Sequence, residues 1–309
     1  MIKKFIVDQL KIRLDRFLAE KVSEVSRSRI QRDIEAGKVQ VNSKQILEGK
    51  FVVREGDKIV YDFVADPGIQ AKPLDIKVLF ENDDLLVIDK PPGLVVHPAP
   101  GYKGVTLAEG LLHKYKDIHA VGDDTDIRPG IVHRLDKDTS GVMLVAKNQK
   151  SFEYLKDAFA SRKIRKEYIT LVHGHVLSQH GFINTPIGRH PTDFRKMAVI
   201  QAKDPKEAIT EYEVLEHLRV GVDEYTLVRV KLHTGRTHQI RVHFSSLGFP
   251  IAGDTLYGKA GKKNILPLPG LERQFLHAAK IEVQLADGSW IETHSELPDD
   301  LQKVLDNIK

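Results

Sequence analysis

A cluster of polar residues with two carboxylates, His-Arg-Leu-Asp-Lys-Asp-Thr-Ser-Gly at residues 133–141, lies between two short apolar runs rich in Val and Ile. Such runs are typical of buried strand ends, and the Thr-Ser-Gly segment favours a turn, so the cluster is predicted to form a loop held at both ends. A carboxylate fixed in such a loop can add covalently to a substrate or remove a proton from it. Asp136 and Asp138 are the candidates for this chemistry, and a solvated turn is the alternative.

A second dense stretch, Thr-Gly-Arg-Thr-His-Gln-Ile-Arg-Val-His at residues 234–243, favours the catalytic interpretation. In residue order and spacing, the two stretches resemble the motifs of the RluA/RluD family of pseudouridine synthases. Lys-Glu-Tyr at 166–168 and Asp-Lys-Pro-Pro-Gly at 89–93 match two further motifs of that family, and the resemblance covers roughly residues 75–300. It implies an isomerase that breaks the glycosidic bond of a uridine in RNA, turns the uracil and rejoins it through carbon, without a cofactor.

The resemblance also implies roles for three residues. It places catalysis on Asp136 rather than on Asp138, and it gives Arg236 the family position that pairs with the catalytic aspartate. An adjacent guanidinium would keep that carboxylate ionised. Tyr168 matches the family's active-site tyrosine, whose ring can stack on uracil and whose hydroxyl can take part in proton transfer. Attack on the sugar, attack on the uracil ring and proton abstraction that gives a glycal-like intermediate all stay open as mechanisms.

An enzyme of this kind must reach a base that lies inside a paired stem, so it has to flip the base outward. Arg134 has a planar cation next to the catalytic loop, and it is our hypothesis for the group that fills the gap. His133 is predicted to bond within the loop or to meet a phosphate, and Lys166 to line the RNA path. The histidines His238 and His243 do not have the spacing of a zinc-protease site, so no metal is predicted.

Composition narrows the class of protein. A chain of 309 residues with 41% hydrophobic content is longer than one small domain, which predicts two domains. No apolar run is long enough to cross a bilayer and no signal-peptide core follows the first residues, so a soluble, cytoplasmic protein without a membrane partner is expected. Because the chain has no cysteine, a disulfide, a thiolate nucleophile and a Cys-ligated zinc site are excluded.

Residues 1–62 read as two amphipathic helices, one starting near Leu14 and one ending at Gly37, followed by short strands. This segment is similar to the small RNA-binding domain first known from a small-subunit ribosomal protein. It has 8 Lys and 6 Arg against 5 Asp and 5 Glu, a net charge of +4 that equals the net charge of the whole chain. Three arginines of the second helix could bind RNA phosphates or merely keep the helix soluble: Arg27, Arg29 and Arg32.

Residues 63–75 contain two prolines and no apolar period, which predicts a linker before a catalytic domain at residues 76–309. Many strands with few helices favour an α+β fold with a mixed, mainly antiparallel sheet, and the resemblance implies the divided sheet of pseudouridine synthases. After the long strand that ends near 232, Thr237 is predicted to cap the next helix.

The sequence thus favours a monomeric RNA pseudouridine synthase acting on 23S large-subunit ribosomal RNA or on a pre-ribosomal particle. The stretches at 94–98 and 188–192 look closest to the RluD type, which modifies large-subunit ribosomal RNA. A transfer-RNA substrate stays open, as does a non-catalytic ribosome-assembly factor with the same fold. A metal-dependent nuclease is a more distant alternative.

Overall fold

The computed structural model describes residues 1–22, 25, 27–63, 69–99, 101–123, 125, 127–199, 202–258 and 268–309. The chain divides into two compact units. The first comprises Met1–Leu74 and His97–Ile131, and the second comprises Asp75–Val96 and Val132–Lys309. The predicted boundaries at residues 62 and 76 stay a prediction. No helix among the described residues is long and apolar enough to span a bilayer.

The first unit begins with the two predicted helices and short strands, with one strand placed before the helices. Helices α1 (Leu14–Lys21) and α2 (Arg27–Glu35) share an apolar core with the strands, because Leu14, Phe17 and Ile30 are fully buried. The strands form a four-stranded sheet of order β1-β6-β3-β4 and a separate pair, β2-β5. Their bounds are β1 Ile2–Ile6, β2 Ile12–Arg13, β3 Val39–Val41, β4 Lys44–Gln45, β5 Val52–Val53 and β6 Lys58–Asp62.

Residues 97–131 of this unit carry helix α3 (Leu107–Lys114) and a 3₁₀ helix, Lys116–Ala120. Helix α3 starts with a capping box, in which the Thr106 hydroxyl accepts from the Glu109 backbone N–H and the Glu109 carboxylate accepts from the Thr106 N–H. Two otherwise unpaired backbone donors are thereby satisfied, which explains why the helix begins at this residue.

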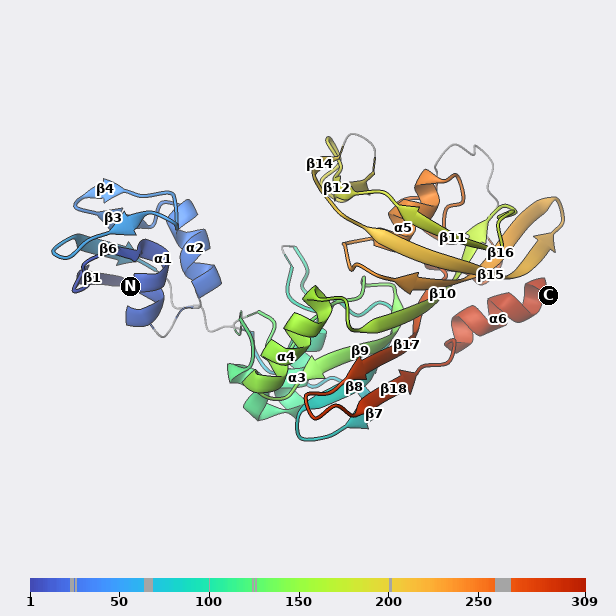
Figure 1. Cartoon of the computed structure of the whole chain (residues 1–309), viewed down its shortest axis with the longest axis horizontal. Helices are drawn as coiled ribbons and strands as arrows, with labels where there is room; N and C mark the ends of the chain where they lie inside the picture. The colour runs from blue at the N-terminus through green and yellow to red at the C-terminus, as the bar shows by residue number, and fades with distance from the viewer. Residues whose placement is uncertain are drawn as a thin grey trace. The chain divides into compact units, whose positions relative to one another are not determined.

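The second unit is built on a nine-stranded sheet of order β11-β15-β16-β10-β17-β9-β8-β7, with β18 also paired to β17. All pairs are antiparallel except β9 with β17, so the mixed, mainly antiparallel sheet is confirmed. Figure 1 shows β10 and β17 at its centre. The bounds are β7 Lys77–Glu81, β8 Leu85–Lys90, β9 Ser140–Ala146, β10 Arg165–His173, β11 His180–Asn184, β15 Ile209–Val220, β16 Asp223–Leu232, β17 Leu276–Gln284 and β18 Trp290–His294.

Three helices and a small sheet complete this unit. The helices are α4 (Gln149–Ala160), α5 (Gln239–Ser246) and α6 (Asp299–Ile308). The sheet joins β12 (Ile187–Arg189) to β13 (Met197–Ala198) and β14 (Lys203–Lys206). The N-cap of α5 is His238 rather than the predicted Thr237, and its side chain makes no capping bond. A backbone turn, and not a side-chain cap, therefore starts this helix.

The one parallel junction brings the catalytic-loop candidate onto the sheet. Strand β9 begins directly after that loop, and its Gly141 pairs with Ala278 of β17. Gly141 has φ +114, and a Cβ at this position would lie 2.2 Å from the Ala278 carbonyl oxygen. Only glycine allows the two backbones to approach so closely, so this glycine fixes the end of the loop against the centre of the sheet.

Candidate active site

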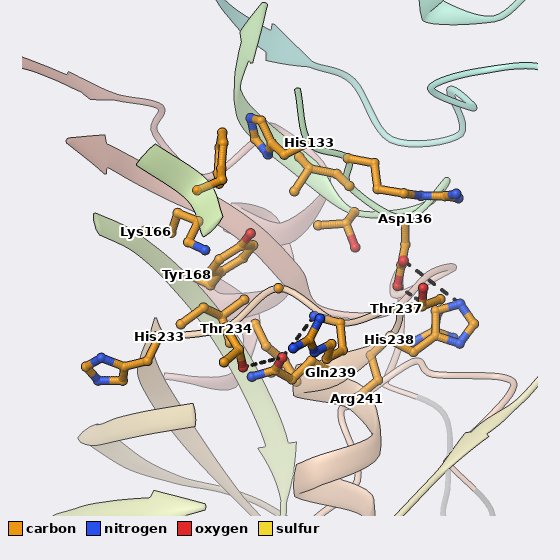
Figure 2. Close-up of a pocket in the computed structure, with 18 of the residues that line it drawn as sticks. His133, Asp136, Lys166, Tyr168, His233, Thr234, Thr237, His238, Gln239 and Arg241 are labelled. Carbon is orange, nitrogen blue, oxygen red and sulfur yellow. Dashed lines mark hydrogen bonds and ion pairs between the residues drawn. The ribbon is translucent and has the colours of Figure 1, made fainter. Parts of the chain in front are cut away.

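A cavity of about 410 Å³ opens beside the loop that contains Asp136. Four segments line it: the loop at 132–139, the start of β10, the turn at 232–238 and the first turn of α5. Figure 2 shows the polar side chains of these segments directed toward the same space. The volume lies at the lower end of the range for small-molecule sites, roughly 300–1,000 Å³, which fits one flipped-out nucleotide.

Asp136 is held by an arginine on α5. The Nη1 atom of Arg241 donates to Asp136 Oδ2 at 3.0 Å. The other side of the same guanidinium is bound by Asp254, with Nε to Oδ2 at 2.7 Å and Nη2 to Oδ1 at 3.0 Å. Because Asp254 also accepts the backbone N–H groups of Leu256 and Tyr257, this carboxylate is fixed and in turn orients Arg241.

The electrostatics of this trio favour the charged forms. The Arg241 side chain is 8% exposed and that of Asp254 is fully buried. Burial alone would lower the pKa of Arg241, but the hydrogen bond and charge of Asp254 outweigh it and raise that pKa, with a further contribution from Asp136. Burial likewise acts to raise the pKa of Asp254, and the hydrogen bond from Arg241 more than reverses it. The guanidinium is therefore a permanent cation beside Asp136.

The prediction that Arg236 pairs with Asp136 is wrong in this structure, because Arg241 takes that place. The Nε atom of Arg236 donates instead to the backbone carbonyl of Glu207 at 2.9 Å. Both arginines belong to the motif at 234–243, but Arg236 precedes the turn and is exposed, whereas Arg241 lies on the first turn of α5 facing the loop. Arg236 still lines the cavity, so contact with RNA is not removed by this correction.

Tyr168 reaches the same cavity from the centre of the sheet. It lies on β10 between Val230 of β16 and Ala278 of β17, next to an irregularity in the strand register. Its burial raises the pKa of the phenol, and the negative charge of Asp136 raises it further. The hydroxyl therefore carries its proton throughout the physiological range, with the ring forming part of the cavity wall (Figure 2).

Three residues predicted to contact RNA also border the cavity, but they differ in character. His133 bonds within the fold, since its Nε2 accepts the Leu144 backbone N–H at 2.8 Å and its ring packs on Phe159. Burial lowers the pKa of His133 to about 3, so the ring is neutral and the proposed phosphate contact is not supported. Burial lowers the pKa of Lys166 to about 8, and its Nζ lies 5.5 Å from the Phe159 ring centroid. Arg134 is exposed at the cavity.

The loop that carries Asp136 is anchored through its backbone, which the sequence did not predict. The fully buried Lys90 donates from Nζ to the carbonyl oxygens of Pro91 at 2.7 Å, Leu94 at 3.1 Å and Lys137 at 3.0 Å. Arg273 donates from Nη1 to the Asp138 carbonyl at 2.9 Å. Lys90 was expected to line the RNA path, whereas all three of its donors bind backbone oxygens inside the fold.

The remaining histidine of the motif is structural. The fully buried His243 contacts Thr210 Oγ1 through Nδ1 at 2.8 Å and the Thr185 carbonyl through Nε2 at 2.9 Å. Both ring nitrogens are thus engaged within the fold. Within the described ranges, no group of three or more His, Asp or Glu side chains is arranged to hold a metal ion.

In the first unit, two of the three arginines predicted to bind RNA are paired with buried carboxylates. Arg27 donates to Asp15 at 2.9 Å, and Arg29 donates to Asp33 at 3.1 Å. Burial acts to raise the pKa of Asp15, but hydrogen bonds from its neighbours hold that pKa at about 2. These two arginines therefore stabilise the fold as well as adding positive charge, while Arg32 is exposed on the same helix.

Comparisons with known proteins agree with this architecture. Residues 84–246 match the family model described as RNA pseudouridylate synthase, and residues 12–59 match the S4 domain. The chain is 40% identical to an uncharacterized RNA pseudouridine synthase of Aquifex aeolicus, over 97% of this chain and 95% of that protein. It is 39% identical to ribosomal large subunit pseudouridine synthase D of Yersinia pestis, over 97% and 92% of the two chains.

Solved structures show the same likeness. Human RNA pseudouridylate synthase domain containing 1 superposes with a TM-score of 0.59 at 27% identity, covering 74% of this chain and 87% of the human one. The matched family residues span the loop of Asp136, strand β10 and the whole of α5. The cavity is thus built from segments that lie inside the shared region.

Proposed function

The chain belongs to the RNA pseudouridylate synthase family, and from this membership we propose that it isomerises specific uridines of large-subunit ribosomal RNA. The similarity to the Yersinia pestis protein over nearly the full chain supports this substrate. The S4 domain supplies a second RNA-binding surface besides the catalytic cavity. The proposal includes a monomeric, cytoplasmic enzyme that acts on ribosomal RNA or on a pre-ribosomal particle.

The observation that carries the proposal is an anionic Asp136 at a nucleotide-sized cavity, held on one oxygen by Arg241. The carboxylate either adds to the substrate or removes a proton from it, and both roles require the ionised form. Arg241 cannot compete for that proton at any physiological pH, because its own pKa is raised. It therefore orients the carboxylate and stabilises its charge without taking part in proton transfer.

Tyr168 supplies the wall on which the uracil stacks, and its protonated hydroxyl is a hydrogen-bond donor inside the cavity. The exposed Arg134 fills the gap that the base leaves in the RNA stem. Unpairing and unstacking the base costs a few kcal/mol, which stacking on Tyr168 and the cation at the gap help to offset. Lys166 adds a second cation at the cavity wall.

The direct test is release of tritium from RNA that carries uridine labelled at carbon 5, since that hydrogen leaves when the new carbon–carbon bond is made. Wild-type protein should release tritium in the presence of a chelator, and purified Asp136→Asn protein should not, while binding RNA with unchanged affinity. Substantial turnover by Asp136→Asn would refute the assignment of Asp136. Restoration of its activity by a divalent metal would favour a metal-dependent site instead.

The RNA substrate needs a test in cells. Pseudouridines should be mapped in total RNA from cells lacking this chain, and again after complementation with wild type or with Asp136→Asn. We expect defined sites of large-subunit ribosomal RNA to lose pseudouridine and to regain it only with wild type. Loss confined to transfer RNA would replace the proposed substrate. An unchanged map, together with a ribosome-assembly defect that Asp136→Asn rescues, would support the non-catalytic assembly factor.

A further inference from the structure

His238 stands between Asp136 and a buried tyrosine, a position that the motif does not explain. Its Nε2 lies 3.9 Å from Asp136 Oδ1, the oxygen opposite the one that Arg241 binds. Its Nδ1 lies 2.9 Å from the hydroxyl oxygen of Tyr257. Figure 2 shows the imidazole beside the Asp136 carboxylate at the edge of the cavity. The two oxygens of this carboxylate thus face two different side chains of the same segment.

The hydrogen bonds of Tyr257 determine which ring nitrogen of His238 carries the proton. The backbone N–H of Met197 donates to the Tyr257 hydroxyl oxygen at 2.7 Å. The hydroxyl has one proton of its own, and Nδ1 of His238 is the acceptor that the described part of the chain places within reach. Burial raises the pKa of Tyr257 to about 12, so the phenol keeps this proton. A neutral imidazole that accepts at Nδ1 must carry its hydrogen on Nε2.

The surroundings keep His238 neutral. Burial lowers the pKa of its imidazole, and the nearby cations Arg241 and Arg134 act in the same direction. The carboxylates of Asp136 and Asp254 oppose this effect without reversing it. The ring therefore presents a neutral N–H, rather than a second full positive charge, to the Asp136 carboxylate.

The backbone of His238 is also unusual. As the N-cap of α5 it has φ 56 and ψ 21, the left-handed conformation that residues with a Cβ adopt at an energetic cost. An N-cap normally uses its side chain to accept a backbone N–H, but the His238 side chain makes no such bond. The strained backbone instead directs the imidazole toward Asp136 and Tyr257.

We propose that His238 is a positioning residue for Asp136, with Tyr257 fixing the Nε2–H tautomer so that this hydrogen is aimed at Oδ1 while Arg241 holds Oδ2. At 3.9 Å the contact is longer than a hydrogen bond, and such contacts in free enzymes shorten when the substrate is bound. Donors on both oxygens would stop the carboxylate from rotating away from the substrate. The inference rests on the proposed function, since it takes Asp136 as the reacting group.

Nitrogen NMR of the full-length protein, uniformly labelled with ¹⁵N, tests the tautomer without any activity measurement. Two-bond correlations of the 14 histidine rings distinguish Nε2–H from Nδ1–H, and His238→Gln identifies the signal of His238. We expect the Nε2–H form in wild type and a rise of the Nδ1–H form in Tyr257→Phe, which lacks the donor. A predominantly Nδ1–H ring in wild type would overturn the inference.

Single-turnover kinetics test the positioning role. His238→Asn suits the left-handed backbone but is too short to reach Asp136, whereas the amide of His238→Gln can donate to it. We expect His238→Asn to slow the chemical step by roughly 10- to 100-fold, the scale of one lost hydrogen bond to a charged group, with RNA affinity unchanged. His238→Gln should recover part of that loss.

The control is His217→Ala, which changes a histidine on β15 that stacks on His175 and should leave the rate unaltered. Wild-type rates in His238→Asn, or equal losses in His238→Asn and His238→Gln, would refute the positioning role. If wild-type protein releases no tritium at all, the proposed function fails, while the NMR result still decides which tautomer Tyr257 imposes.

Discussion

Replacing Arg241 by Met tests whether this arginine, rather than Arg236, controls the catalytic carboxylate. The change keeps the apolar volume but removes the cation that joins Asp136 to Asp254. Asp136 loses a hydrogen bond from a charged donor, worth about 1.5–3 kcal/mol, so the single-turnover rate should fall by roughly 10- to 150-fold. Arg236→Met, the matched control, removes an exposed side chain bonded to a backbone carbonyl. It should leave Asp136 correctly held.

The same change should destabilise the fold, because Asp254 would remain buried without its partner. Breaking a buried ion pair by removing one member costs about 3–5 kcal/mol, which corresponds to a fall in melting temperature of roughly 6–20 °C. Arg236→Met, at an exposed site, should change the free energy of unfolding by no more than about 0.5 kcal/mol. Calorimetry of the two variants next to wild type measures this difference.

The pH dependence of stability gives a third readout. In wild type the folded-state pKa of Asp254 lies below its ordinary value of 3.8, so this carboxylate stabilises the protein above that pH. The contribution is lost as the pH falls through the lowered folded-state pKa. In Arg241→Met, burial without the cation would raise the pKa of Asp254 instead. The variant's loss of stability should then be largest at neutral pH and should shrink as the pH falls through that raised pKa.

A double variant separates structure from catalysis. Arg241→Met with Asp254→Asn removes both charges, so most of the lost stability should return while the rate stays low. The reasoning fails if Arg236→Met shows the losses in rate and stability and Arg241→Met does not. It also fails if the double variant is no more stable than Arg241→Met alone, since the unpaired Asp254 would then not be the cause.

Three further predictions concern other residues. Tyr168→Phe keeps the stacking ring, worth about 1–3 kcal/mol per base, so RNA affinity should stay unchanged while tritium release slows; wild-type turnover would leave stacking as the only role. Burial lowers the pKa of Lys90 to about 7 from 10.5, so between these values the unfolded chain binds more protons than the folded one. The stability of wild type relative to Lys90→Met should therefore rise with pH over that interval, and denaturant titrations showing no such rise would contradict a depressed pKa. Alanine at all three arginines of α2 should lower the slope of log affinity against log salt by about 0.7 per phosphate contact with single-stranded RNA, and an unchanged slope would exclude this helix face from RNA binding: Arg27, Arg29 and Arg32.

The sequence predicted the parts of the fold that depend on local patterns. The helical spacing of Leu14, Phe17 and Leu18 gave α1, and the turn at 287–288 gave the hairpin of β17 and β18. The strand that leaves the catalytic loop was also predicted, because its apolar run is buried throughout. Such signals act over a few residues and depend little on distant contacts.

The partner of Asp136 could not be predicted in the same way. Arg236 and Arg241 stand five positions apart in one motif, and a pattern of residue types does not say which faces the loop. The left-handed turn at His238 decides it, and that conformation is rare for a residue with a Cβ. Asp254, which orients Arg241, lies in a separate turn beyond the motif and has no signal of its own. Contacts between distant segments therefore completed the site.

The cations around the catalytic loop are arranged so that only one of them binds the carboxylate of Asp136. Lys90 donates to the carbonyl of Lys137, and Arg273 donates to the carbonyl of Asp138, so these two charges fix the loop through its backbone. Backbone oxygens keep their place whatever happens to the side chain, whereas a carboxylate bound by several cations would be a weak nucleophile and a weak base. Anchoring the loop by its carbonyls thus makes Asp136 rigid while leaving its second oxygen to a neutral donor and to the substrate.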